Sequence, residues 1–270
     1  MPNSKTILIT GAGSGLGEGT AIGLAQAGHN VIAGVHIYPQ ATALRKKVKE
    51  LGLEKNLQVE RLDVLDHFDV SNSLRWDVDI LVNNAGIGET GPIFEMPIEL
   101  VHKNFETNYF APLNLAQKFI AKFINEKKKG KVVFLSSMGG LFLPAHFGSY
   151  CSTKHAIEAL AESLQQEVKK YGIQIQTINP GAFTTGFNET MLETSFRWLD
   201  DDKNFTKRTD LHAEIEKQLD SPDWRLVPQD MIDVMVKVIP SETGKFRNVF
   251  PQFVEDMLKE SMAKAWDNVI

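Results

Sequence analysis

The sequence predicts an α/β fold, a doubly wound parallel sheet with helices on both of its faces. Two features predict it. Short apolar runs alternate along the chain with longer segments in which apolar residues recur at helical spacing. Several of the short runs are apolar at every position, as strands are when a sheet is covered on both sides. Since no internal repeat or low-complexity linker is present, one domain spanning residues 1–270 is expected.

The expected elements follow in chain order. The strands are expected at Thr6–Thr10, Val31–Val35, Leu57–Leu62, Val78–Val82, Val132–Leu135 and Ile173–Ile178. The first helix follows the glycine-rich turn and should end at Gly28. Further helices are expected over about Gln40–Leu51, over roughly Ile98–Phe123 with a kink at Pro112, and from Tyr150 onward. Only twenty residues separate Asp63 from Asn83, so the helix between them should be a turn or two long.

Composition and charge exclude several classes of protein. With 43% hydrophobic and 23% charged residues, the chain has the composition of an ordinary soluble globular protein. A net charge of −5 offers no general attraction to nucleic acid or to an anionic membrane surface, and no apolar run approaches the length of a membrane span. The first strand begins too early to leave room for a signal peptide, and the single Cys151 excludes an internal disulfide. A cytoplasmic protein is therefore expected, with no bound metal, membrane or nucleic acid.

A glycine-rich turn follows the first strand. Thr6–Thr10 runs into Gly11-Ala-Gly-Ser-Gly-Leu-Gly17, and a helix comes next. In this setting such a turn binds phosphate, because the glycines let the backbone approach a pyrophosphate and the helix N-terminus supplies free N–H groups. The spacing Gly11-x-x-x-Gly15-x-Gly17 is not the common G-x-G-x-x-G, so the inference depends on the flanking strand and helix.

The other strands also end in polar or glycine-rich sequence. These ends are Asp63-Val64, Asn83-Asn84-Ala85-Gly86, Ser137 and Pro180-Gly181. In open parallel sheets, ligands bind beyond the carboxyl ends of the strands. A site is therefore expected at this edge of the sheet.

Three side chains near the middle of the chain form a set suited to proton transfer. Tyr150 and Lys154 stand four apart on the expected helix, so they share one of its faces, and Ser137 ends the preceding strand. A tyrosine with its ordinary pKa of about 10 is a poor acid–base catalyst at neutral pH, and an adjacent ammonium favours the phenolate. The phenol could then exchange a proton with an alcohol or carbonyl oxygen, while Ser137 holds the same oxygen. Taken alone, Tyr-x-x-x-Lys also occurs by chance on helices.

In this order and spacing, the motifs resemble those of the short-chain dehydrogenase/reductase family, in its compact single-domain form with a Rossmann fold. The resemblance covers about residues 5–185. It implies that Tyr150 is the general acid/base and that Ser137 positions and polarises the substrate oxygen. It further implies that Lys154 lowers the pKa of Tyr150 and holds the nicotinamide ribose, and that Asn108 supports a water that connects Lys154 to solvent.

The resemblance also implies which residues hold a nicotinamide cofactor. The phosphates are expected at Gly11, Ser14, Gly15, Leu16 and Gly17. The adenine is expected at Asp63 and Val64, with Asn83, Ala85 and Gly86 lining the adenosine side. The nicotinamide, near Tyr150 and Lys154, is expected to face Pro180, Gly181, Phe183 and Thr185.

The second strand decides which cofactor is expected. It ends in Ala33-Gly34-Val35-His36, without the acid that binds the ribose hydroxyls of NAD in this family and without an arginine for the phosphate of NADP. A 2′-phosphate meets no carboxylate at Val35, and His36 could donate a hydrogen bond to it. We therefore expect a mild preference for NADP, with NAD as the alternative.

The chain departs from the family pattern after Thr185. Gly186–Pro228 is long for a connection, and in this fold it covers the substrate, so it is expected to form a helical lid that includes Phe187, Met191 and Trp198. Phe142, Leu143, Phe147 and Phe183 should face it, which predicts an apolar pocket for an alcohol, ketone or aldehyde. Glu89 and His146 are polar candidates near the mouth, for which a solvated surface role is expected.

Lys245–Val249 lacks the glycine-rich ending of tetrameric members of the family, so a homodimer through the helices of Asn108 and Tyr150 is favoured.

Three functions are compatible with parts of this pattern. An oxidoreductase uses every motif above. A non-catalytic dinucleotide sensor remains an alternative, although it has no need of Ser137, Tyr150 and Lys154 together. An epimerase or dehydratase can share the Tyr/Lys pair but usually brings a larger C-terminal region.

Overall fold

The computed structural model describes residues 4–219 and 225–267. Within these ranges seven parallel strands form one sheet in the order β3-β2-β1-β4-β5-β6-β7. The chain winds outward from β1 in one direction and then in the other, so the doubly wound fold is confirmed. The strands are β1 (Thr6–Ile9), β2 (Asn30–Val35), β3 (Leu57–Arg61), β4 (Ile80–Asn83), β5 (Lys131–Leu135), β6 (Gln174–Pro180) and β7 (Arg247–Phe250).

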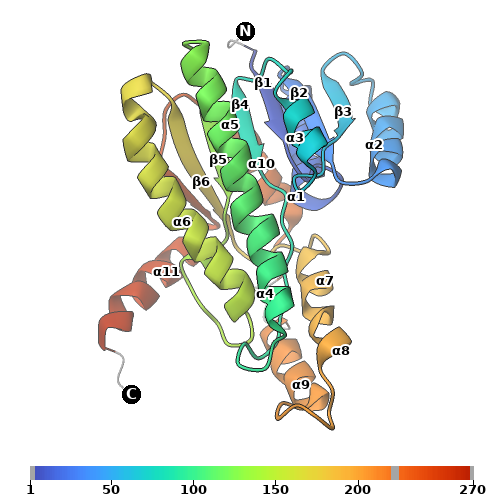
Figure 1. Cartoon of the computed structure of the whole chain (residues 1–270), viewed down its shortest axis with the longest axis vertical. Helices are drawn as coiled ribbons and strands as arrows, with labels where there is room; N and C mark the ends of the chain where they lie inside the picture. The colour runs from blue at the N-terminus through green and yellow to red at the C-terminus, as the bar shows by residue number, and fades with distance from the viewer. Residues whose placement is uncertain (1–3, 220–224, 268–270) are drawn as a thin grey trace.

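Two hydrophobic cores lie on the two faces of this sheet. Ile7 and Ile9 of β1 face one core, and Leu8 between them faces the other, as the alternation of side chains along a strand requires. The first core is closed by α1 (Gly15–Gln26), α2 (Tyr38–Glu50) and α10 (Pro228–Val238). The second is closed by α3 (His67–Ser73), α5 (Ala111–Asn125) and α6 (Gly148–Val168), and Figure 1 shows α5 and α6 in front of the sheet.

Two crossover helices bear on the sequence predictions. The helix between β3 and β4, α3, has seven residues, so the expected shortening to about two turns is confirmed. The long helical segment is α4 (Ile98–Phe105), a π-helical turn (Glu106–Phe110) and α5. The departure from α-helical geometry therefore lies in the turn before Pro112, whereas the kink was expected at Pro112 itself. Pro112 has no N–H to donate to the carbonyl of Asn108, which interrupts the α-helical ladder at this turn.

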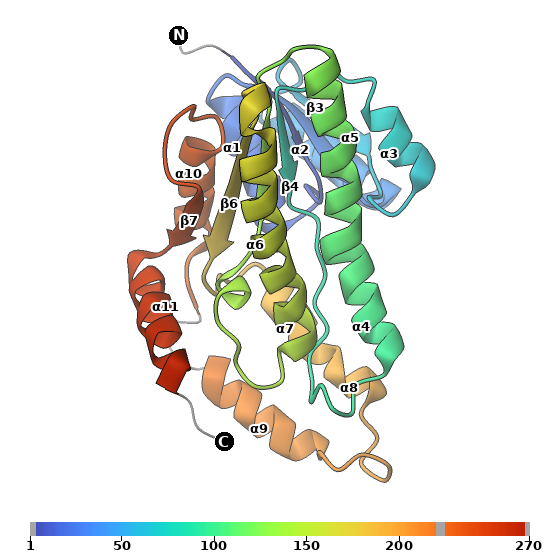
Figure 2. The same ribbon diagram turned by 60° about the vertical axis from the view of Figure 1, so that its left-hand side comes forward.

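The last third of the chain contains the helices expected after Thr185, followed by elements that sequence patterns did not predict. Three short helices, α7 (Phe187–Glu193), α8 (Ser195–Trp198) and α9 (Arg208–Leu219), lie beyond the carboxyl ends of the strands (Figure 2). The chain then returns to the sheet through α10 and β7 and ends in α11 (Gln252–Lys264). Arg247 of β7 donates to the buried carboxylate of Glu158 on α6 at 2.9 Å, which ties the edge strand to the fold.

A third apolar cluster holds α7–α9 against the body of the molecule. Phe147, Tyr150 and Cys151, at the start of α6, pack with Met191, Leu192, Leu199, Leu211 and Ile215. The side chains of these helices are therefore anchored next to Tyr150. Within the described ranges, no helix is both long enough and apolar enough to span a bilayer.

Candidate active site

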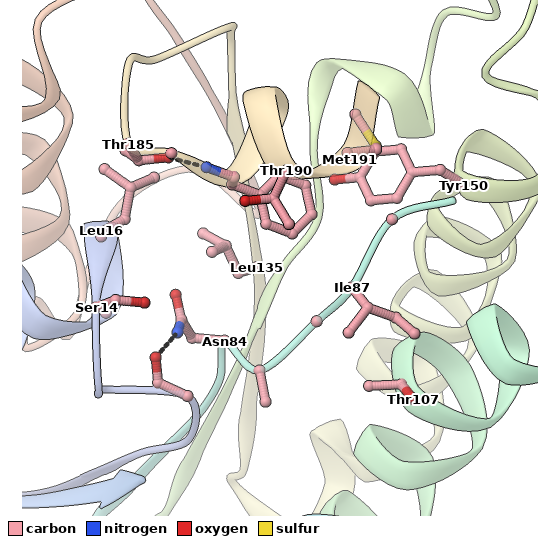
Figure 3. A pocket seen from close by; sticks show the side chains of 18 of the residues that line it. Ser14, Leu16, Asn84, Ile87, Thr107, Leu135, Tyr150, Thr185, Thr190 and Met191 are labelled. Atoms are coloured by element: carbon pink, nitrogen blue, oxygen red, sulfur yellow. Dashed lines mark hydrogen bonds between the residues drawn. The ribbon is translucent and has the colours of Figure 1, made fainter. Parts of the chain in front are cut away.

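One cavity of about 740 Å³ runs along the carboxyl ends of the strands (Figure 3). Ser14 and Leu16 lie at one end of it and Tyr150 and Met191 at the other. The structure brings together every residue proposed for the site except Asn83 and Asn108. The proposed residues that line the cavity are Gly11, Ser14, Gly15, Leu16, Gly17, His36, Asp63, Val64, Ala85, Gly86, Ser137, Tyr150, Lys154, Pro180, Gly181, Phe183 and Thr185.

The glycine turn has the shape needed to hold a pyrophosphate. Gly11 adopts a φ of +65°, and a Cβ there would lie 2.7 Å from the Cα of Ala85. At Gly17 a Cβ would lie 2.5 Å from the carbonyl oxygen of Gly11, so neither position accepts a side chain. No side chain caps the N-terminus of α1, and its first N–H groups have no partner within the helix. The turn therefore fits the phosphates of a dinucleotide.

Thr10 fastens the turn after β4 to the glycine turn. Its Oγ1 accepts hydrogen bonds from the backbone N–H groups of Asn84 and Ala85, both at 3.0 Å. The Asn84 side chain donates to the carbonyls of Thr10 and Gly11 at 2.8 and 3.1 Å and lines the cavity. Asn84 was missed in the sequence. Asn83, which was proposed instead, is buried at the end of β4 and does not line the cavity.

His36, Gln40 and Asp63 line the cavity beyond the ends of β2 and β3. The Nε2 of His36 lies 3.3 Å from Oδ2 of Asp63. The His36 side chain is 66% exposed, so it can turn toward a ligand, whereas Val35 before it is fully buried. Gln40 stands in the first turn of α2, whose N-terminus has no side-chain cap.

The three proton-transfer residues meet at the opposite end. The Oγ of Ser137 accepts a hydrogen bond from the Gly139 N–H at 3.0 Å and is hydrogen-bonded to Tyr150. The Nζ of Lys154 donates to the Leu135 carbonyl at 2.9 Å and lies 5.6 Å from the centroid of the Tyr150 ring. Ser137 and Lys154 therefore flank the phenol, Ser137 at its hydroxyl and Lys154 beside its ring.

Burial controls the protonation of these groups. It raises the pKa of Tyr150 well above its usual range, although the hydrogen bond with Ser137 acts in the opposite direction. It lowers the pKa of Lys154 to about 8, against the carboxylate of Glu158. The pKa of Tyr150 is therefore raised overall and not lowered as expected, because burial of the phenol outweighs its hydrogen bond with Ser137. Tyr150 stands as a protonated acid.

Comparison with known proteins identifies the family. A family model described as short chain dehydrogenase matches residues 5–195. The chain belongs to the short-chain dehydrogenase family. It is therefore an oxidoreductase that binds a nicotinamide dinucleotide. Retinol dehydrogenase 8 from Bos taurus is 30% identical over 254 residues, which span 90% of this chain and 80% of that protein.

Solved structures share the fold of this short-chain dehydrogenase. One from Burkholderia phymatum, in complex with NAD, has a TM-score of 0.79 at 21% identity and covers 97% of this chain and 94% of that one. A gluconate 5-dehydrogenase from Burkholderia cenocepacia, in complex with NADP and tartrate, has a TM-score of 0.75 at 22% identity, with 94% and 96% covered. The fold thus accommodates either cofactor.

Asn108 of this dehydrogenase lies behind the cavity wall, in the π-helical turn. Its Oδ1 accepts from the Ile87 N–H at 2.9 Å, and its Nδ2 donates to the Ile87 carbonyl at 2.8 Å and to Thr153 at 3.1 Å. A Cβ at Gly86 would lie 3.2 Å from Oδ1 of Asn108 and 3.8 Å from Nζ of Lys154. Asn108 therefore fixes the segment after Asn84 and stands close to Lys154.

The end of the cavity at Tyr150 is less apolar than expected for this dehydrogenase. Phe187 packs on Tyr150 with ring centroids 5.8 Å apart, and Phe142 and Phe147 line a small adjoining cavity. Polar groups also line the main cavity, and sequence reasoning missed most of them: Lys103, Thr107, Thr190, Thr194 and Arg197. Leu143 is exposed, and so is Phe205 of the lid.

Glu89 and His146 differ from their predicted surface role. Glu89 is buried at 5% exposure, lines the cavity and pairs with Lys103 at 2.8 Å. His146 does not line the cavity. Its side chain is 17% exposed, and its Nε2 lies 2.7 Å from Oε2 of Glu214 on α9. His146 therefore connects the loop before α6 to α9.

Proposed function

We propose that this dehydrogenase interconverts an apolar secondary alcohol and the corresponding ketone, or acts on an aldehyde, with Tyr150 as the general acid/base. The observation that carries the proposal is that Ser137, Tyr150 and Lys154 meet at one end of a cavity whose other end is the glycine turn. The nicotinamide dinucleotide supplies or accepts the hydride when it is bound. The chain's own residues hold the substrate oxygen and move the proton.

In reduction, Tyr150 donates its phenolic proton to the substrate carbonyl oxygen, and Ser137 donates a hydrogen bond to the same oxygen. Burial favours this role, because it keeps the phenol protonated until the oxygen acquires charge. The Lys154 ammonium then stabilises the phenolate that forms. In oxidation the proton moves from the alcohol to Tyr150.

Asn108 and Lys154 are proposed to reprotonate Tyr150 through water. Two features support this role. Lys154 is buried, has a pKa lowered to about 8 and is therefore able to give up a proton near neutral pH. The side chain of Asn108 stands close to Lys154, since a Cβ at Gly86 would lie 3.2 Å from Oδ1 of Asn108 and 3.8 Å from Nζ of Lys154.

The preferred cofactor is proposed to be NADP(H), with NAD(H) as the alternative. No carboxylate stands at Val35 to repel a 2′-phosphate or to bind ribose hydroxyls. His36 and the uncapped N-terminus of α2 offer donors to that phosphate. Asp63, 3.3 Å from His36, opposes them, and for this reason the preference is expected to be mild.

The segment 186–228, of which residues 220–224 lie outside the described ranges, is proposed to be the substrate lid of a single-domain enzyme. Phe187 and Met191 line the cavity, and the third apolar cluster holds their helix next to Tyr150. A homodimer through α4, α5 and α6 is also proposed, because Ile98 and Phe110 expose apolar surface there. Location in the cytoplasm stays a prediction.

One assay tests the proposal. Secondary alcohols, ketones and aldehydes are screened by nicotinamide absorbance with both cofactors, alongside the variant Ser137→Ala. We expect turnover of apolar carbonyl compounds with NADPH, lost in the variant. Tight binding of cofactor without turnover of any compound in the panel would contradict the proposal and favour a sensor.

A further inference from the structure

The lid presents one helical face to the cavity, and this face changes character along its length. Phe187, Thr190, Met191, Thr194 and Arg197 all line the cavity. Their spacing of three and four residues places them on one side of α7 and α8, which follow each other through Thr194 in a right-handed helical conformation. The face is apolar at Phe187 and Met191 and cationic at Arg197.

The apolar part of this face adjoins the reacting centre. The Phe187 ring lies 5.8 Å from that of Tyr150, and Met191 packs in the same cluster as Tyr150. Arg197 is six residues beyond Met191, which corresponds to about 9 Å along a helix. Since α8 follows α7, Arg197 stands at the end of this helical face that is away from Phe187.

Arg197 forms no ion pair within the part of the chain that the structure describes, residues 4–219 and 225–267. The other charges at this end cancel, because Glu89 pairs with Lys103 at 2.8 Å. Lys154 belongs to the reacting centre. Among the described residues that line this end of the cavity, Arg197 is therefore an exposed cation without a carboxylate partner, and its guanidinium can bind a carboxylate through two parallel hydrogen bonds.

We infer that Arg197 binds an anionic tail of the substrate, so that the enzyme acts on carbonyl or alcohol compounds with an apolar body and a distant carboxylate. The inference rests on the proposed function and names the substrate class of the same site. The reacting carbonyl lies at Tyr150 and Ser137, the apolar body along Phe187 and Met191, and the carboxylate at Arg197. Specificity then arises from the charge at one end and from the chemistry at the other.

A cofactor phosphate is the other source of negative charge in this cavity. The glycine turn and Thr185 lie at the start of the lid, since a Cβ at Gly15 would be 3.4 Å from Thr185. Arg197 is twelve residues farther along the chain, on the helix that leads away from this point. This position favours a substrate carboxylate over a cofactor phosphate as the ligand of Arg197. The two ligands can be distinguished by experiment.

The test compares three aldehydes that share one reacting end: 10-oxodecanoate, its methyl ester and decanal. Steady-state kinetics with NADPH are measured for the wild-type enzyme, for Arg197→Gln, and for Arg75→Gln as a control. Arg75 is an exposed arginine after α3 and does not line the cavity. Its substitution makes the same change in net charge as Arg197→Gln but leaves the cavity lining intact. Binding of decanoate to the complex with NADP is measured by calorimetry in the same three proteins.

We expect the wild-type enzyme to favour 10-oxodecanoate over the ester about tenfold in kcat/KM, equivalent to about 1.4 kcal/mol. Arg197→Gln should abolish this preference through KM and weaken decanoate binding, with decanal and the KM for NADPH unchanged. Arg75→Gln should match the wild type.

Three other results would count against the account. An equal loss for all three aldehydes with a raised KM for NADPH would assign Arg197 to the cofactor and overturn the inference. Turnover of decanal with no preference for the acid would overturn it while the proposed function stands. No turnover at all would contradict the proposed function, and unchanged decanoate binding in Arg197→Gln would then still overturn the inference.

Discussion

The side chain of Asn108 pairs with both backbone groups of Ile87, at 2.9 Å to its N–H and 2.8 Å to its carbonyl. The π-helical turn presents this amide to the segment that follows Asn84. The segment also carries Gly86 and Glu89 along the cavity wall. One side chain therefore fixes this part of the cavity wall.

Asn108→Ala is expected to lower both stability and activity. It leaves the half-buried backbone groups of Ile87 without their partners, which costs about 1 kcal/mol, at the lower end of the roughly 1–3 kcal/mol typical of a buried unsatisfied group. Chemical denaturation measures the loss, and Kd for NADPH reports the altered wall. Asn104→Ala is the control, because Asn104 is equally buried but donates to Ser149. Equal effects of the two substitutions on cofactor affinity would contradict a positioning role for Asn108.

His36→Asp is expected to shift the ratio of kcat/KM for the two cofactors toward NAD by about tenfold. The new carboxylate would repel the 2′-phosphate of NADP by about 1 kcal/mol or more. His36 is a better position for this change than Val35, whose side chain is fully buried and would bury the new charge. The ratio of kcat/KM for NADPH and NADH measures it, with His36→Gln as the uncharged control. An unchanged ratio in His36→Asp would show that His36 lies outside the phosphate site.

Met191→Ala is expected to reduce kcat/KM for bulky apolar ketones more than for small ones. Met191 lines the cavity next to Tyr150, and loss of its apolar surface weakens only substrates that reach it. Phe205→Ala serves as the control, because that side chain is 88% exposed. Trp198 packs against Gly91, so it is a poorer probe of the substrate than sequence reasoning indicated. An equal loss for small and bulky ketones would make Met191 a packing residue only.

Lys131→Met tests a buried charge far from the active site. Its Nζ donates to the carbonyls of Val238, Ile239 and Ser241 at 3.2, 3.0 and 3.0 Å, and burial lowers its pKa to about 8 from 10.5. Between these pH values the unfolded state binds more protons, so this lysine makes the free energy of unfolding rise with pH.

The variant loses this rise together with the three hydrogen bonds. The difference in unfolding free energy between wild type and Lys131→Met should therefore favour the wild type increasingly from about pH 8 to pH 10. Urea denaturation at several pH values measures it, and other titrating groups cancel in the difference. A difference independent of pH would contradict the lowered pKa of Lys131.

The sheet and most of the cavity could be predicted from the sequence because they follow from local patterns. Continuous apolar runs specify buried parallel strands, and the carboxyl ends of such strands share one edge. Gly11, Asp63, Ser137 and Pro180 meet there for this reason, although each stands in a different part of the chain.

The rest depends on contacts between distant segments. Asn84, and not Asn83, faces the cavity because Thr10 binds the two N–H groups that follow β4. Arg197 lines the cavity because an apolar cluster docks the lid on the start of α6. The raised pKa of Tyr150 results from burial beneath that lid. None of these contacts leaves a periodic signal in the sequence.

The central claim is that Tyr150 transfers the proton, and Tyr150→Phe tests it most directly. The ring and its packing remain, and only the hydroxyl is lost. Turnover of the best substrate from the carbonyl panel is measured together with Kd for NADPH by fluorescence, with the exposed Tyr171→Phe as the control. We predict that kcat falls by about 10²–10⁴ while cofactor affinity is retained. Turnover near that of the wild type in Tyr150→Phe would contradict the claim.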